Sequence, residues 1–317
     1  PVAEWRSEEN IGTPVVVFNP MAYDVSRPVA VRSMPEYMTD LNGTEIAMQK
    51  VRASKTNVND KHEVLFMADV PALGYTVYRM YFSKKSTKQY ENEFICSDNC
   101  IENSRIKLCI NDKTGEVQSV YNKENGKEML QGETKTVFID ETNCDTWAHD
   151  IPKFDKEIKT TAIGTVRLTE TGPIRATLRS KIKLLDTEII RDYSITAGSN
   201  IIEVKTIVDF REKHKMLKFR IPVSVRDVKA YAKIPYGYTQ RPTDGCEQPC
   251  GEWITVNDGT DGICLANDSK YSFDANNNVL SLTILRGAVY ADHFGERDEF
   301  CRYMEQGEHE FKYSIAP

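Results

Sequence analysis

Short segments of alternating apolar and polar residues, separated by turn-forming residues, run along this chain and restrict what it can fold into. The clearest is Tyr75-Thr-Val-Tyr-Arg-Met-Tyr-Phe82, which alternates and is rich in aromatic and β-branched side chains. Turn signals such as Asn42-Gly43 and residues 111–115 and 123–126 separate these segments. No long segment shows the 3.6-residue period of a helix. The pattern predicts an all-β protein of the sandwich type.

The distribution of these segments predicts two β domains. A compact group of strands is expected before residue 83, and the polar stretch 83–89 resembles a linker. We place the small domain at residues 1–86 and the large domain at residues 87–317. In the large domain, the same pattern predicts strands at residues 104–110, 116–121, 162–170, 174–184, 187–195, 201–210, 215–223 and 279–285.

Composition excludes several classes of partner. The 317 residues carry a net charge of −6 without an evident concentration of Lys and Arg, so we expect no nucleic-acid partner. No apolar run approaches the length that spans a bilayer, so we expect no membrane partner. The chain begins Pro1-Val-Ala-Glu-Trp5, without an initiator Met or a signal peptide. We therefore expect a piece of a longer protein.

The eight cysteines form no complete metal-binding pattern. Cys96 and Cys100 are separated by three residues, as are Cys246 and Cys250, but no second tight pair or His pair accompanies either. The chain is also large and is not dense in Cys, unlike small disulfide-rich scaffolds. We expect free thiols in a reducing cytoplasm, and regard a zinc clip as the weaker alternative.

Two polar and aromatic clusters and one strand-end arginine are the candidate functional residues. Residues 145–150 include Trp147 and Asp150, and residues 290–293 include Asp292 and His293. Arg286 directly follows a predicted strand. An aromatic face with nearby carboxylates suits a sugar, which stacks on the ring and donates its hydroxyls. Solvated loops and a surface arginine explain the same residues, so both interpretations stay open.

Ordered blocks along the chain resemble the C-terminal β region of glycoside hydrolase family 38, the α-mannosidases, with the bacterial branch most similar. The loop 145–150 resembles an Asp-x-Trp-Asp block of the family, with His149 as a departure. The other blocks that carry the resemblance are Val17-Phe-Asn-Pro20, residues 101–117, residues 121–128, Gly172-Pro-Ile-Arg-Ala176, residues 208–218, residues 234–242, residues 267–271, Leu285-Arg286 and residues 307–313.

The resemblance implies a fold and an activity. The fold is a small immunoglobulin-like β-sandwich followed by a large galactose-mutarotase-like supersandwich. The activity is that of a retaining α-mannosidase on mannosides or mannose-containing oligosaccharides. Such enzymes use an Asp nucleophile and a Zn²⁺ ion. In the family these residues belong to an N-terminal catalytic domain, so no nucleophile and no metal ligand are assigned to this chain. The partners implied are that domain and, in a homo-oligomer, further copies of the protein.

The resemblance also assigns roles to single residues. Arg286 matches a family arginine that lines the pocket, and Trp147, Asp150, Asp292 and His293 are further substrate-binding candidates. His214 and Arg241 lie in matching blocks and are expected to be structural. Two alternatives remain: a stand-alone carbohydrate-binding or scaffold module, and a mutarotase-type epimerase, which needs a convergent His and Glu pair. The glycosidic linkage of the substrate does not follow from the sequence.

Overall fold

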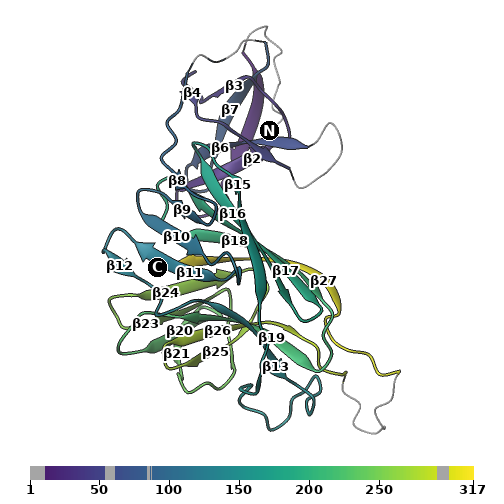
Figure 1. The fold of residues 1–317 in the computed structure, drawn as a ribbon. Coiled ribbons are helices and arrows are strands. Elements are labelled where there is room, and N and C mark those ends of the chain that lie inside the picture. Colours follow the sequence, from purple (N-terminus) through teal and green to yellow (C-terminus); the bar gives the residue numbers. More distant parts are fainter. Residues whose placement is uncertain (1–10, 54–60, 84–85, 87, 291–299) are drawn as a thin grey trace. The chain divides into compact units, whose positions relative to one another are not determined.

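The computed structural model describes residues 11–53, 61–83, 86, 88–290 and 300–317. These residues form strands joined by turns and loops, without a helix, so the all-β prediction is confirmed (Figure 1). Accordingly, no helix in the described part of the chain could cross a membrane. The chain divides into two compact units. The first holds the described residues up to Phe94 together with Glu170–Arg175, and the second holds the remainder.

The first unit is a sandwich of two small antiparallel sheets. Their strand orders are β1-β7-β3-β4 and β2-β6-β5. Phe66 of one sheet packs on Tyr78 of the other with 4.8 Å between ring centroids, and Met38 is fully buried beside them. This apolar layer holds the two sheets together. The strands are β1 Thr13–Phe18, β2 Val25–Val31, β3 Tyr37–Thr39, β4 Glu45–Ile46, β5 Gln49–Arg52, β6 His62–Val70 and β7 Tyr75–Tyr81.

The second unit contains sheets of five, six and nine strands, whose orders are β12-β11-β10-β9-β8, β14-β13-β19-β26-β25-β22 and β15-β16-β17-β18-β27-β24-β23-β20-β21. The strands are β8 Ile95–Cys96, β9 Cys100–Glu102, β10 Ile106–Ile110, β11 Val117–Asn122, β12 Lys127–Glu128, β13 Lys135–Asp140, β14 Glu157–Ile158, β15 Ile163–Glu170, β16 Arg175–Leu184, β17 Thr187–Thr196, β18 Ile202–Phe210, β19 Lys215–Pro222, β20 Lys229–Ile234, β21 Gly237–Arg241, β22 Gln248–Pro249, β23 Trp253–Asn257, β24 Gly262–Asn267, β25 Ser272–Asn276, β26 Val279–Arg286 and β27 Gly307–Ala316.

The six-stranded and nine-stranded sheets pack face to face. Phe138 meets Phe210 with 6.3 Å between ring centroids, and Phe219 meets Tyr313 with 5.6 Å. In β18, buried residues alternate regularly with half-buried ones, as expected of a strand with one face on this core. The predicted architecture, a small sandwich before a large supersandwich, is confirmed, whereas the boundary at residues 86 and 87 remains a prediction.

A buried cation joins all three sheets of the second unit. Arg191 of β17 is almost fully buried and pairs with Glu116, which immediately precedes β11, at 3.5 Å. Its Nη2 donates to Thr136 of β13 at 2.9 Å, and its guanidinium lies over the Phe219 ring. Burial lowers the pKa of Arg191, but Tyr313, Tyr193 and Glu116 oppose this, and the pKa lies above the usual range. Because an unpaired charge here would be costly, this cluster specifies how the sheets meet.

The expectation of free thiols is wrong for two of the eight cysteines. Cys100 and Cys109 form a disulfide, because they are directly opposite each other on β9 and β10, with 4.2 Å between their Cα atoms. The sequence had drawn attention to Cys96 as the neighbour of Cys100, but strand pairing decides which sulfurs meet. Cys144, Cys246, Cys250 and Cys264 are free thiols.

Candidate functional site

Arg286 is the last residue of β26, and its guanidinium is held by a fixed set of acceptors. Nε donates to Oε1 of Glu141 at 2.7 Å, and Nη2 lies 2.6 Å from the same oxygen. Nη2 also donates to the carbonyl of Asp145 at 3.1 Å, and Nη1 donates to the carbonyl of Thr146 at 3.2 Å. A guanidinium has five N–H donors. One Nη1 N–H therefore has no acceptor among the described residues, and the side chain remains 19% exposed.

Glu141, which follows β13, is the anionic partner of Arg286 and is fully buried. Its Oε2 accepts no hydrogen bond from any described residue. Burial raises the pKa of Glu141, and the neighbouring Arg286 opposes that shift. A second carboxylate, Glu305, accepts the backbone N–H of Arg286 at 2.6 Å. The strand end is thus fixed through both its backbone and its side chain.

The loop after Glu141 presents an exposed aromatic ring. Oδ1 of Asp145 accepts the backbone N–H groups of Trp147 at 2.8 Å and Ala148 at 3.2 Å, which forms an Asx turn. Ala148 and Asp150 have φ values of 45° and 60°, so the loop turns through the left-handed region twice. The Trp147 ring stacks on His149 with 6.1 Å between centroids and is 63% exposed. Trp147 therefore does not cap the hydrophobic core.

His214 connects this loop to the end of β26. Its backbone N–H donates to the carbonyl of Gly287 at 2.7 Å, and its own carbonyl accepts the N–H of Glu141 at 2.8 Å. Its ring nitrogen Nε2 is 2.9 Å from the hydroxyl of Tyr303, and the two rings meet edge to face. A φ of 55° lets its backbone make both contacts. The backbone of His214 thus connects the start of the Trp147 loop to the residue after β26.

The Phe154 ring contacts both Arg286 and a buried ionic cluster around Lys218. Its ring centroid is 5.5 Å from the Arg286 guanidinium and 5.9 Å from Nζ of Lys218. Lys218 is fully buried and pairs with Glu247, and also with Asp274 at 2.5 Å. Burial raises the pKa of Asp274, and Lys218 opposes that shift. One face of the six-stranded sheet therefore carries two cations with an aromatic ring between them.

The structure brings some of the predicted residues together. Arg286 and the loop of Trp147 are in direct contact through the Thr146 carbonyl, and Asp150 lies exposed in the same loop. Asp292 and His293 lie outside the described residues. Arg241, at the end of β21, donates to the carbonyl of Pro249, at a distance of 3.2 Å.

Sequence reasoning missed Glu141 and Phe154, both of which contact Arg286. Glu141 is 145 residues away from Arg286 in the chain. Its one detectable signal was its place at a strand end, just before the Trp147 loop. Phe154 had no comparable signal.

The described residues do not form a zinc site. Among them, no group of three or more His, Cys, Asp and Glu side chains is placed to hold a metal ion.

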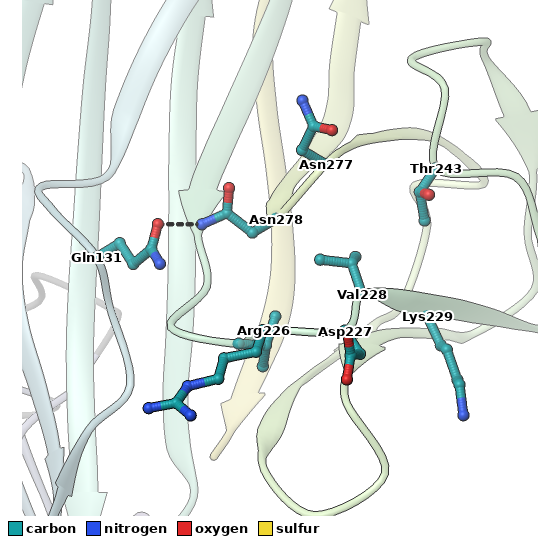
Figure 2. Close-up of a pocket in the computed structure, with 9 residues that line it drawn as sticks. Gln131, Arg226, Asp227, Val228, Lys229, Thr243, Asn277 and Asn278 are labelled. Atoms are coloured by element: carbon teal, nitrogen blue, oxygen red, sulfur yellow. Dashed lines mark hydrogen bonds between the residues drawn. The ribbon is translucent and has the colours of Figure 1, made fainter.

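Two cavities lie near the turn Asn276–Asn278. One, of about 550 Å³, is lined by Gln131, Thr243 and residues 225–229, and Figure 2 shows its charged side chains pointing in different directions. The other, of about 470 Å³, lies on the sheet face that carries Lys218 and Phe154. The second cavity is the better candidate for a ligand site, because polar side chains from several strands line it.

Comparison with known proteins assigns this architecture to a family. Residues 101–294 match the glycosyl hydrolases family 38 C-terminal domain, and residues 45–80 match the lysosomal alpha-mannosidase-like central domain. Alpha-mannosidase 2C1 of Mus musculus is 24% identical over 272 residues, which cover 80% of this chain and 25% of that protein. Alpha-mannosidase G of Dictyostelium discoideum is 22% identical, over 96% of this chain and 29% of that protein. The chain therefore spans between a quarter and a third of these relatives.

Solved structures agree on the fold. A glycosyl hydrolase family 38 protein from Enterococcus faecalis superposes with a TM-score of 0.73 at 16% identity, over 96% of this chain and 44% of that one. An alpha-mannosidase from Enterococcus faecalis V583 gives the same TM-score at 15% identity, over 96% of this chain and 43% of that one. Since the family 38 C-terminal domain matches more than half of the sequence, this chain belongs to glycosyl hydrolase family 38.

Proposed function

We propose that this chain is the C-terminal β region of a retaining α-mannosidase, which hydrolyses terminal α-mannosyl residues, and that its own residues bind and orient the sugar. The family match and the similarity to alpha-mannosidases support the enzyme class. The observation that carries the role of this chain is the constrained guanidinium of Arg286, which has one Nη1 N–H without an acceptor among the described residues. A fixed cationic donor suits a sugar hydroxyl.

The surroundings of Arg286 supply the rest of a sugar site. Trp147 offers an exposed ring on which the apolar face of a pyranose can stack. Glu141 holds the guanidinium in one orientation, so the donor is placed before the sugar arrives. Ordering the donor in advance lowers the entropic cost of binding.

We propose that bond cleavage itself belongs to residues outside this chain. A retaining glycosidase needs a free carboxylate nucleophile and a second carboxyl group as acid and base. Glu141 and Glu305 are both engaged by Arg286. Neither the nucleophile nor a zinc ligand is assigned to the described residues. The chain of 317 residues should therefore not hydrolyse an aryl α-mannoside, and zinc-stimulated turnover by the purified chain would contradict this division of roles.

The test of Arg286 is its replacement by Ala in the complete protein. Losing a hydrogen bond from a charged donor costs ~1.5–3 kcal/mol, so kcat/KM for 4-nitrophenyl α-mannoside should fall about 10- to 150-fold. Arg286→Lys should recover little, because an ammonium cannot bond Glu141 and both carbonyls in the same geometry.

The matched control is Arg105→Ala, which removes a half-exposed arginine paired with Glu124. It should leave kcat/KM unchanged. Wild-type kinetics in a folded Arg286→Ala protein would remove Arg286 from the site. The thermal unfolding midpoint of each variant shows whether it is folded.

Cellular location and assembly remain predictions. The expected cytoplasmic location depends on free thiols, whereas a disulfide such as Cys100–Cys109 is more typical of an oxidising compartment. Alkylating free thiols in intact cells before purification would decide the point, since a native disulfide protects both residues. Self-association is measured by light scattering on the complete protein.

A further inference from the structure

The cavity of about 470 Å³ shares a sheet face with Arg286. The registers of four neighbouring strands align Lys135 with Arg220, Arg220 with Ser281, and Ser281 with Asp274. All four residues line the cavity. They form one row across β13, β19, β26 and β25. The side chains come from rigid strands, which position ligand groups more accurately than loops do.

Arg286 occupies another row of the same face. It pairs with Met216, which is four residues before Arg220 on β19. Because a strand rises about 3.3 Å per residue, four residues place the two rows about 13 Å apart. Phe154 covers the sheet between them, because it lines the cavity and also lies 5.5 Å from the Arg286 guanidinium. The cavity and the candidate site are therefore neighbours, separated by more than the width of one sugar ring.

The lining of the cavity suits a neutral ligand with many hydroxyl groups. It combines one aromatic ring, hydrogen-bond donors of both charged and amide type, and several carboxylate acceptors. Four of its side chains are acidic and two are basic, which disfavours an anion such as phosphate. The charged residues are Glu133, Lys135, Asp155, Glu157, Arg220 and Asp274.

Buried interactions hold the walls in place. Asp274 is 8% exposed and is bonded to the buried Lys218. Arg220 pairs with Glu157, and both residues line the cavity. Because these side chains are already ordered by their partners, a sugar would bind without first fixing them.

We propose that this cavity is a second sugar subsite, which binds an inner pyranose unit of an oligosaccharide whose terminal mannose lies near Arg286. The inference rests on the proposed function. It adds that the enzyme prefers oligosaccharides to single mannosides, and that residues of β13, β19 and β25 carry this preference.

The test compares two substrates in the complete protein, a linear α-linked mannotriose and 4-nitrophenyl α-mannoside. The measured quantity is the ratio of their kcat/KM values. Lys135→Met and Glu157→Gln should each lower this ratio about tenfold, the effect of losing one charged hydrogen bond. Phe154→Ala should lower it too. Controls are Glu188→Gln, on a surface pair with Lys181, and Phe82→Ala, on an exposed ring, and both should keep the wild-type ratio.

Calorimetric titration gives a second measurement, which does not need hydrolysis. It compares the binding of mannotriose and of methyl α-mannoside to the 317-residue chain. The trisaccharide should bind more tightly, and Lys135→Met should remove the difference. Equal binding of both sugars, or an unchanged ratio in folded Lys135→Met and Glu157→Gln proteins, would overturn the subsite. An Arg286→Ala protein with full activity would overturn the proposed function instead. If Phe154→Ala does not fold, the two exposed positions still decide the matter.

Discussion

Lys218→Met is the sharpest test of how this site is supported. Lys218 is fully buried, and its ammonium is bonded to both Glu247 and Asp274. Met keeps most of the volume of the side chain but removes the charge, so two carboxylates face each other without a cation. Removing one partner of a buried ion pair typically costs ~3–5 kcal/mol. We expect the free energy of unfolding to fall by that amount at neutral pH.

The loss should depend on pH with a defined sign. Burial already raises the pKa of Asp274 above its ordinary value of 3.8, and Lys218 opposes that shift. Without Lys218, the folded-state pKa rises further. A carboxyl group with a raised pKa stabilises the folded state most below its unfolded pKa, and that contribution is lost as the pH rises through the folded pKa. The deficit of the variant should therefore shrink from pH 7 toward pH 4. The double variant Lys218→Met and Asp274→Asn should recover part of the lost free energy of unfolding.

Urea unfolding followed by tryptophan fluorescence and circular dichroism measures this loss. The control is Lys205→Met, because Lys205 pairs with Glu310 on the surface at 2.9 Å. This substitution should change the free energy of unfolding by less than ~1 kcal/mol. A loss below ~1 kcal/mol for Lys218→Met, or a deficit that does not vary with pH, would refute the argument that a buried charge cluster underlies this face.

Two further substitutions test the fold around the site. Gly287→Ala should destabilise the protein by ~1–3 kcal/mol, because its Cβ would lie 2.2 Å from the Glu212 carbonyl oxygen, whereas Gly132→Ala meets nothing within 4 Å. Equal unfolding midpoints for the two variants would contradict this. Cys100→Ser should lower the free energy of unfolding by ~2–3 kcal/mol, because it opens the loop that the disulfide with Cys109 closes. Reductant should lower the unfolding midpoint of the wild type and leave that of Cys100→Ser unchanged, and no effect on either would argue against the bond.

The positions of many strands could be predicted from the sequence, because each depends on a local pattern. The expected strand at residues 201–210 corresponds to Ile202–Phe210, and the expected strand at 187–195 corresponds to Thr187–Thr196. The sequence also predicts a single strand at residues 45–51, but this segment divides into Glu45–Ile46 and Gln49–Arg52, which belong to different sheets. Alternation identifies which residues face a core. It does not identify the sheet that provides the core.

Strand partners depended on the tertiary structure. Phe210 of β18 pairs with Gly307 of β27, although almost a hundred residues separate them. The Cys100–Cys109 bond follows from strand register in the same way. A hydrophobic pattern specifies a face of a strand, and many pairings satisfy the same pattern, so side-chain packing selects among them.

The sequence by itself determined the all-β class, the order of the strands and the family, because these follow from local alternation and from ordered blocks of residues. It also singled out Arg286 and Trp147. Only the tertiary structure decided that Glu141 orients Arg286, that Phe154 lies between Arg286 and Lys218, and that a polar cavity continues along the same sheet face. The reason is physical: a buried charge needs its partner within a few ångströms in space, and the chain can supply that partner from any distance in sequence.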